Sequence, residues 1–89
     1  MAAQDLNADL IGVPGARAKI ATPALIIDLD AMEANIAAMA AHAKKNNIAL
    51  RPHAKTHKCS EIAKLQMAAG ALGICCAKLG EAEALADAD

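Results

Sequence analysis

The segment from Arg51 to Lys58 reads Arg-Pro-His-Ala-Lys-Thr-His-Lys and concentrates groups that could do chemistry. It holds two of the 3 histidines and three of the 9 lysine and arginine residues of the chain. An apolar run, Ile48 to Leu50, leads into it. At the end of a buried strand, desolvation and cationic neighbours would favour the neutral amine of Lys55. Such an amine is a nucleophile toward a carbonyl carbon.

Alternate residues of a β-strand share a face, so the residue order predicts which side chains lie together. If the strand continues to His57, four polar side chains share one face: Arg51, His53, Lys55 and His57. Thr56 and Lys58 would point the other way and are weaker candidates. Because active sites of parallel α/β folds lie at the C-terminal ends of strands, we expect the four to line a site there.

The residue pattern leaves two other interpretations open. A charged run is usually solvated, so His53 and Lys55 could lie in a surface loop that meets only water. His53 and His57 could also bind a metal together with Cys59. Their spacing suits a helix face, and Pro52 disfavours a helix here.

The surrounding sequence alternates between apolar runs and segments with helical periodicity. The apolar runs predict strands over 24–29, 48–53 and 72–76. Cys75 and Cys76 end the last of these, and we expect one of the pair to face inward as a small core residue rather than a nucleophile. Pro52 is awkward within a central strand because it donates no ladder hydrogen bond.

Polar residues and glycines mark the ends of three predicted helices. Asp30 and Glu33 resemble a capping box for a helix that ends near Asn46-Asn47. Ser60 and Gly70 mark the beginning and the end of a second helix, and a third begins at Glu81 after a loop at 78–80.

This order of elements predicts a parallel sheet with crossover helices, as either a doubly wound sheet or a (β/α)8 barrel. Residues 1–21 have no clear period and are expected to form an N-terminal arm, with the α/β domain beginning at residue 22. The chain has 89 residues and is rich in alanine, without Phe, Tyr or Trp, so its core should be thin. We expect it to be the N-terminal piece of a longer protein.

Charge and composition argue against several partners. The net charge of −1 gives no electrostatic case for nucleic acid or an anionic membrane. No apolar run has the length of a membrane span, and the N-terminus does not look like a signal peptide. Three cysteines, two of them adjacent, do not suggest a disulfide framework. A reducing cytoplasm is the simplest expectation.

Three blocks of the sequence resemble the start of the D-threonine aldolase and D-serine dehydratase family, which includes 3-hydroxy-D-aspartate aldolases. The blocks are Thr22 to Asp30, Arg51 to Lys58, and Gly73 to Glu83. Members of this family are fold-type III pyridoxal phosphate enzymes akin to alanine racemase. The resemblance implies that residues 22–89 begin an alanine-racemase-like (β/α)8 barrel, which this chain does not complete. A C-terminal β domain would follow, and the strand at 24–29 would join it.

The resemblance also implies roles for residues. Lys55 matches the lysine that holds pyridoxal 5'-phosphate as a Schiff base and is the expected catalytic residue. Arg51, His53 and His57 are expected to line the cofactor site. A divalent metal, Mn, Mg or Zn, is expected from a C-terminal region outside this chain, with no metal ligand within it.

The expected function is a lyase reaction on D-β-hydroxy amino acids, with retro-aldol cleavage of Cα–Cβ as in D-threonine or 3-hydroxy-D-aspartate aldolases. The alternatives are a D-serine dehydratase, a non-catalytic pyridoxal phosphate-binding barrel, or an inactive fragment. The 89 residues alone are not expected to be active. Family members suggest a homodimer for the full-length protein.

Overall fold

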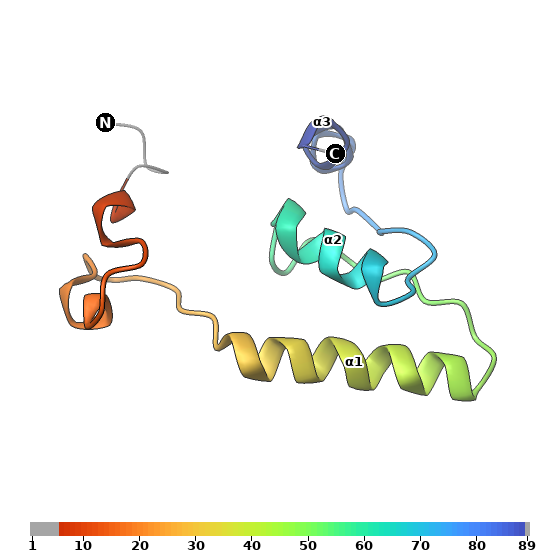
Figure 1. The fold of residues 1–89 in the computed structure, drawn as a ribbon. Helices are drawn as coiled ribbons and strands as arrows, with labels where there is room; N and C mark the ends of the chain where they lie inside the picture. The colour runs from red at the N-terminus through yellow and green to blue at the C-terminus, as the bar shows by residue number, and fades with distance from the viewer. Residues whose placement is uncertain (1–5, 89) are drawn as a thin grey trace.

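A computed structural model of the chain describes residues 6–88, so residues 1–5 of the predicted arm lie outside the described residues. The arm contains two short 3-10 helices, η2 (Ala8–Leu10) and η3 (Ala16–Lys19). Three α-helices follow: α1 (Leu29–Lys45), α2 (Ser60–Ala68) and α3 (Leu79–Ala88). Figure 1 shows the arm beyond the N-terminal end of α1, with α2 between α1 and α3.

The N-cap of helix α1 lies two residues before the predicted cap. Asp28 has an extended backbone, and its Oδ1 accepts a hydrogen bond from the backbone N–H of Ala31 at 3.1 Å. This is the usual geometry of an N-cap. Asp30 lies inside the first turn. The predicted capping box of Asp30 and Glu33 is therefore wrong, because an aspartate two residues earlier already caps the helix.

The predicted ends of α1 and α2 are confirmed, and both are Schellman motifs. At the end of α1, Asn47 has a φ of 53°, and the N–H of Ile48 donates to the carbonyl of Ala43 at 2.9 Å. At the end of α2, Gly70 has a φ of 117°, and the N–H of Ala71 donates to the carbonyl of Gln66 at 3.1 Å. Asparagine and glycine tolerate this left-handed conformation, so these positions could be read from the sequence.

The other two helix starts differ by one or two residues from the prediction. Helix α2 has Cys59 at its N-cap, and Ser60 is its first helical residue. Helix α3 begins at Leu79 rather than at Glu81. The N–H of Ala82 donates to the carbonyl of Lys78 at 3.2 Å, so the helical hydrogen bonds already begin at Lys78. The carboxylate of Glu81 also accepts the backbone N–H of Ala77 at 3.4 Å.

The predicted strands at 48–53 and 72–76 lie side by side in parallel, but they form a single bridge between His53 and Cys75. The N–H of Cys75 donates to the carbonyl of Pro52 at 2.8 Å, and the N–H of Ala54 donates to the carbonyl of Cys75 at 2.9 Å. Pro52 has no N–H for the next ladder bond toward Gly73, which explains why the pairing is short.

The predicted strand at 24–29 is wrong for the described residues. Residues 24–28 form neither helix nor strand and pair with no other segment among residues 6–88, and Leu29 already belongs to α1. Leu25 is 102% exposed. An extended segment becomes a strand only when a second segment satisfies its N–H and C=O groups.

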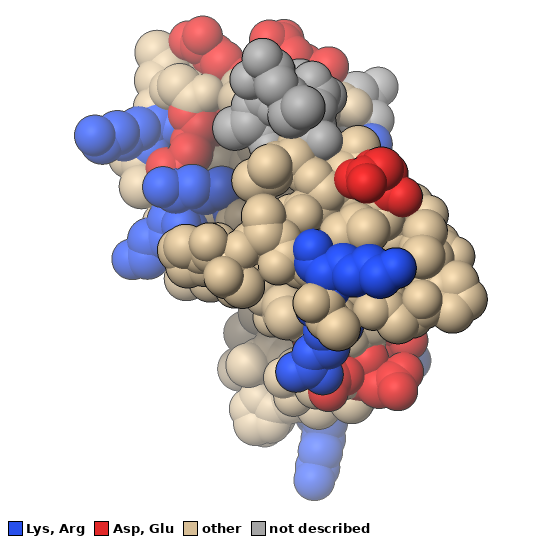
Figure 2. Space-filling model, turned by 90° about the vertical axis from the view of Figure 1, so that its left-hand side faces the viewer, with Lys and Arg blue, Asp and Glu red and all other residues tan. Residues whose placement is uncertain are grey.

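The core is thin, as the alanine-rich composition predicts. The buried apolar residues of the described chain are all alanines: Ala43, Ala54, Ala63 and Ala71. Figure 2 shows basic and acidic side chains interspersed on the face seen there. None of the helices within residues 6–88 combines the length and apolar character that a membrane crossing requires.

Candidate active site

Lys55 lies in a turn that directly follows the parallel pairing. The turn is closed by a hydrogen bond of 2.8 Å from the N–H of Lys58 to the carbonyl of Ala54. Ala54 is 1% exposed and is held against the neighbouring segment by its bond to Cys75. Lys55 therefore lies at the C-terminal edge of the paired segments, where the sequence placed it.

The extended conformation ends at His53, and this corrects the predicted alternation through His57. Residues 54–57 form the turn, so the rule that alternate residues share a face applies to Arg51 and His53 but not to Lys55 and His57. The change occurs because Ala54 is bonded to two different segments, Cys75 across the pairing and Lys58 along the chain.

Lys55 is exposed in the described structure, so its amine is not desolvated by residues 6–88. Within those residues the only ion pair joins Lys64 to Glu61 at 3.6 Å. No carboxylate of the described chain therefore lies within ion-pair distance of the Lys55 amine. The backbone of Lys55 is fixed by contrast: its N–H donates to Nδ1 of His53 at 3.1 Å.

His53 is half-buried, and this hydrogen bond determines its tautomer. A backbone N–H can only donate, so Nδ1 must be the acceptor and the neutral ring carries its proton on Nε2. His53 also borders a hollow of about 310 Å³ between α1 and α2.

His57 is held through both ring nitrogens. Its Nδ1 accepts the backbone N–H of Cys59 at 3.0 Å, and its Nε2 lies 3.3 Å from Oε1 of Gln66. The first contact leaves the proton on Nε2, which donates to Gln66. The sequence did not single out Gln66, because a residue nine positions away in another element carries no local signal.

Arg51 is exposed, and its guanidinium occupies the space beside Gly73. A Cβ atom at position 73 would collide with Nη1 of Arg51. The register of the pairing explains this proximity, because Arg51 and Gly73 lie between two contacts of the same two segments. These contacts are the hydrogen bond of 2.8 Å from the N–H of Leu72 to the carbonyl of Leu50 and the bridge between His53 and Cys75. The role of Gly73 depends on that register and could not be read from one strand.

The two adjacent cysteines face different surroundings. Cys75 lies opposite His53, on the side of the pairing that also carries Arg51 and Gly73. Cys76 lines a hollow of about 430 Å³ between α2 and α3. Both are half-buried free thiols. Within residues 6–88, no three His, Cys, Asp or Glu side chains come together as a metal site.

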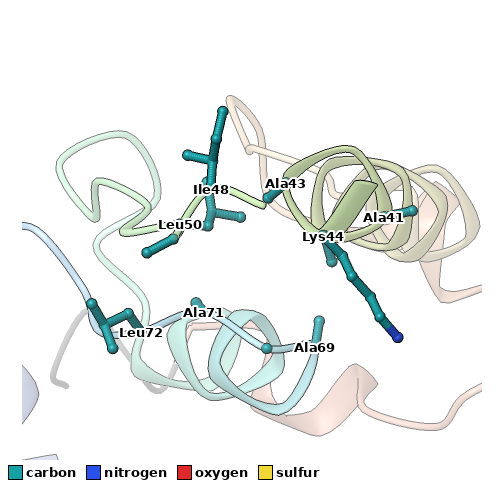
Figure 3. A pocket seen from close by; sticks show the side chains of 11 residues that line it. Ala41, Ala43, Lys44, Ile48, Leu50, Ala69, Ala71 and Leu72 are labelled. Atoms are coloured by element: carbon teal, nitrogen blue, oxygen red, sulfur yellow. The ribbon is translucent and has the colours of Figure 1, made fainter. Parts of the chain in front are cut away.

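A hollow larger than the two described above lies at the opposite end of the paired segments. It measures about 630 Å³ and is lined by the end of α1, residues 48–50 and residues 69–72. Figure 3 shows Ile48, Leu50 and Leu72 around it, with the Lys44 side chain extending from α1. These residues lie at the N-terminal ends of the paired segments or just before them, whereas Lys55 follows their C-terminal ends, so this hollow is not the candidate site.

A comparison with known protein families supports this architecture. Residues 27–89 match the model of the alanine racemase N-terminal domain. The chain therefore belongs to the alanine racemase N-terminal domain family, and its helices and paired segments are part of that α/β barrel fold, which these residues leave incomplete.

Three curated relatives narrow the resemblance. The chain is 57% identical over 65 residues to a D-threonine aldolase of an Arthrobacter species, covering 73% of this chain. It is 43% identical over 84 residues to a 3-hydroxy-D-aspartate aldolase of Paracoccus denitrificans, covering 92% of this chain. It is 50% identical over 62 residues, or 70% of this chain, to a D-threo-3-hydroxyaspartate dehydratase of a Delftia species. The chain spans 17%, 22% and 16% of those relatives respectively.

A solved structure shows the same fold. The crystal structure of a D-threonine aldolase from Filomicrobium marinum superposes on this chain with a TM-score of 0.78 and 59% sequence identity. The match covers 80% of this chain and 19% of the aldolase chain.

Proposed function

We propose that the protein to which this chain belongs is a pyridoxal phosphate-dependent lyase acting on D-β-hydroxy amino acids. The observation that carries the proposal is the position of Lys55. It lies in a fixed turn at the C-terminal edge of a parallel pair, within a domain family akin to alanine racemase. The two aldolase relatives and the aldolase structure favour cleavage of the Cα–Cβ bond.

The residues at this edge fit the chemistry of pyridoxal phosphate, which offers an aldehyde and a phosphate group. Lys55 would hold the cofactor covalently through Nζ. Arg51 would supply a fixed charge with planar donors for the phosphate or the ring. Both cations lie outside ion-pair distance of every described carboxylate, which leaves them available to an anionic ligand. When bound, the cofactor supplies the electron sink for the breaking bond.

We also propose that His53 and His57 line this site, where their rings would contact the cofactor in different ways. The Nε2–H of His53 has no hydrogen-bond acceptor within residues 6–88 and could donate to the cofactor. His57 uses both ring nitrogens within the protein, so it would contact the cofactor only through its ring carbons.

The proposed reaction breaks one carbon–carbon bond. The β-hydroxyl group of the substrate loses its proton, Cα and Cβ separate, and the Cβ fragment leaves as an aldehyde. Cα then takes up a proton, and the amino acid product is glycine.

The second candidate function is a dehydratase, and the relative from Delftia favours it. In that reaction the α proton and the β-hydroxyl group leave as water. A second water molecule then releases ammonia and a keto acid. The matched region is common to relatives of both kinds, so Lys55 would serve either reaction.

Several features of the whole protein complete the proposal. We place residues 1–21 in an arm and 22–89 at the start of the barrel. A divalent metal near the substrate hydroxyl, a homodimeric assembly and a cytoplasmic location are proposed from the resemblance to aldolases. The small-molecule substrate is a D-amino acid.

The test is borohydride reduction of the native gene product in the presence of pyridoxal phosphate, followed by peptide mapping. A pyridoxyl group on Lys55 is the expected result, and an unmodified Lys55 would overturn the proposal. Incubation with D-threonine and with D-threo-3-hydroxyaspartate then separates the two reactions. Glycine and an aldehyde indicate the aldolase, whereas a keto acid and ammonia indicate the dehydratase.

A further inference from the structure

The turn that carries Lys55 is fastened by side chains as well as by backbone. Two histidines accept the N–H of the residue two positions later, His53 from Lys55 and His57 from Cys59. Such local contacts satisfy backbone donors that the turn leaves without a ladder partner. The first lies before the lysine and the second after it, so the backbone of the turn is held at both of its ends.

His57 also connects the turn to a separate element. Its Nε2 lies 3.3 Å from the side-chain oxygen of Gln66, which is in α2. The contact is partly buried, so water competes with it less than with an exposed pair. The backbone carbonyl of Gln66 also accepts the N–H of Ala71. Gln66 therefore contacts both the turn and the connection that leads into the paired segment 72–76.

We propose that His57 and Gln66 are positioning residues for the Lys55 amine, a role that rests on the proposed function. The ring of His57 fixes the end of the turn to helix α2 and thereby restricts where the flexible side chain of Lys55 begins. Because a nucleophile displaced by about 1 Å can lose up to about 100-fold in rate, a link of this kind affects chemistry without touching the reacting atoms.

The experiment measures how fast Lys55 of the native gene product is modified by saturating pyridoxal phosphate, with borohydride trapping at timed intervals. His57→Asn retains an acceptor near the position of Nδ1 but does not reach Gln66. His57→Ala loses both contacts. We expect His57→Ala to slow the modification by about tenfold or more and His57→Asn to be intermediate.

Gln66→Ala removes the same contact that His57→Asn removes. The two single variants should therefore slow the modification equally, and the double variant should be no slower than either. His42→Ala is the matched control, because His42 is exposed on α1 and its ring makes no hydrogen bond within residues 6–88. Its rate should equal that of the unmodified protein.

Circular dichroism and urea midpoints separate positioning from folding, and rates are compared only for folded protein. A folded His57→Ala or Gln66→Ala variant with an unchanged rate would overturn the inference while leaving the proposed function intact. Additive effects of His57→Asn and Gln66→Ala would overturn it as well. If the unmodified protein forms no Lys55 adduct, the proposed function fails first and this inference fails with it. If His57→Ala does not fold, Gln66→Ala decides.

Discussion

The two ends of the paired segments 48–53 and 72–76 differ in structure: one is a turn held by hydrogen bonds, and the other borders an apolar hollow. At the C-terminal end, the small turn at 54–57 is fastened by five hydrogen bonds, three of them to histidine rings. At the N-terminal end, a hollow of about 630 Å³ is lined by alanine, glycine, isoleucine and leucine, with Lys44 as its one charged residue. The larger space has fewer groups that could do chemistry, so the volume of a hollow does not identify the site here.

The largest difference between the two ends is expected when one lysine is removed from each. Lys55→Ala should abolish the borohydride-stable pyridoxyl adduct of the native gene product, because the amine that holds the cofactor is gone. Lys44→Ala should leave the adduct unchanged. Mass spectrometry of the reduced protein measures both. An adduct that persists in Lys55→Ala and disappears in Lys44→Ala would place the chemistry at the wrong end.

Added volume should be tolerated at one end and not at the other. Ala54 is 1% exposed and borders none of the hollows described above, so Ala54→Leu should destabilise the protein by about 1–3 kcal/mol. Ala71 is 9% exposed but lines the large hollow, so Ala71→Leu should change stability by less than about 0.5 kcal/mol. Urea denaturation compares the two. Equal losses would show that the large hollow is filled in the native protein.

A methyl group at Gly73 should displace the Arg51 guanidinium from its present position. We expect Gly73→Ala to weaken pyridoxal phosphate binding by about tenfold, which corresponds to about 1.4 kcal/mol. Gly80→Ala is the control, since a Cβ there meets no atom within 4 Å. In an Arg51→Ala background, Gly73→Ala should cause no further loss of pyridoxal phosphate affinity. Absorbance titration measures the affinity, and an equal loss in both backgrounds would separate Gly73 from Arg51.

The smallest expected effect concerns two residues with left-handed backbones. Lys58, with a φ of 50°, closes the Lys55 turn, and Asn47, with a φ of 53°, ends α1. Lys58→Gly should raise stability by less than about 1 kcal/mol because it relieves strain, offset by the greater flexibility of glycine when unfolded. Asn47→Gly should be nearer to neutral, since asparagine tolerates this conformation. Urea midpoints measure both stability changes. A larger increase in stability for Asn47→Gly than for Lys58→Gly would contradict this prediction.

Local signals in the sequence predicted a good part of the fold. The ends of α1 and α2 were predicted because Asn47 and Gly70 suit left-handed backbones, a requirement that depends on neighbouring residues alone. The thin core followed from alanine content. The strand at 24–29 was not confirmed, because a strand needs a partner and residues 6–88 supply none.

The sequence by itself determined the family, the helix ends and the place of Lys55 just after an apolar segment. Tertiary structure decided where the extension stops, which cysteine lies beside His53, and which groups hold the turn. The bond from Ala54 to Cys75, the contact of His57 with Gln66 and the clearance that Gly73 leaves for Arg51 each join separate segments. Backbone preferences act between neighbours along the chain, whereas these contacts exist only once the register between segments is set.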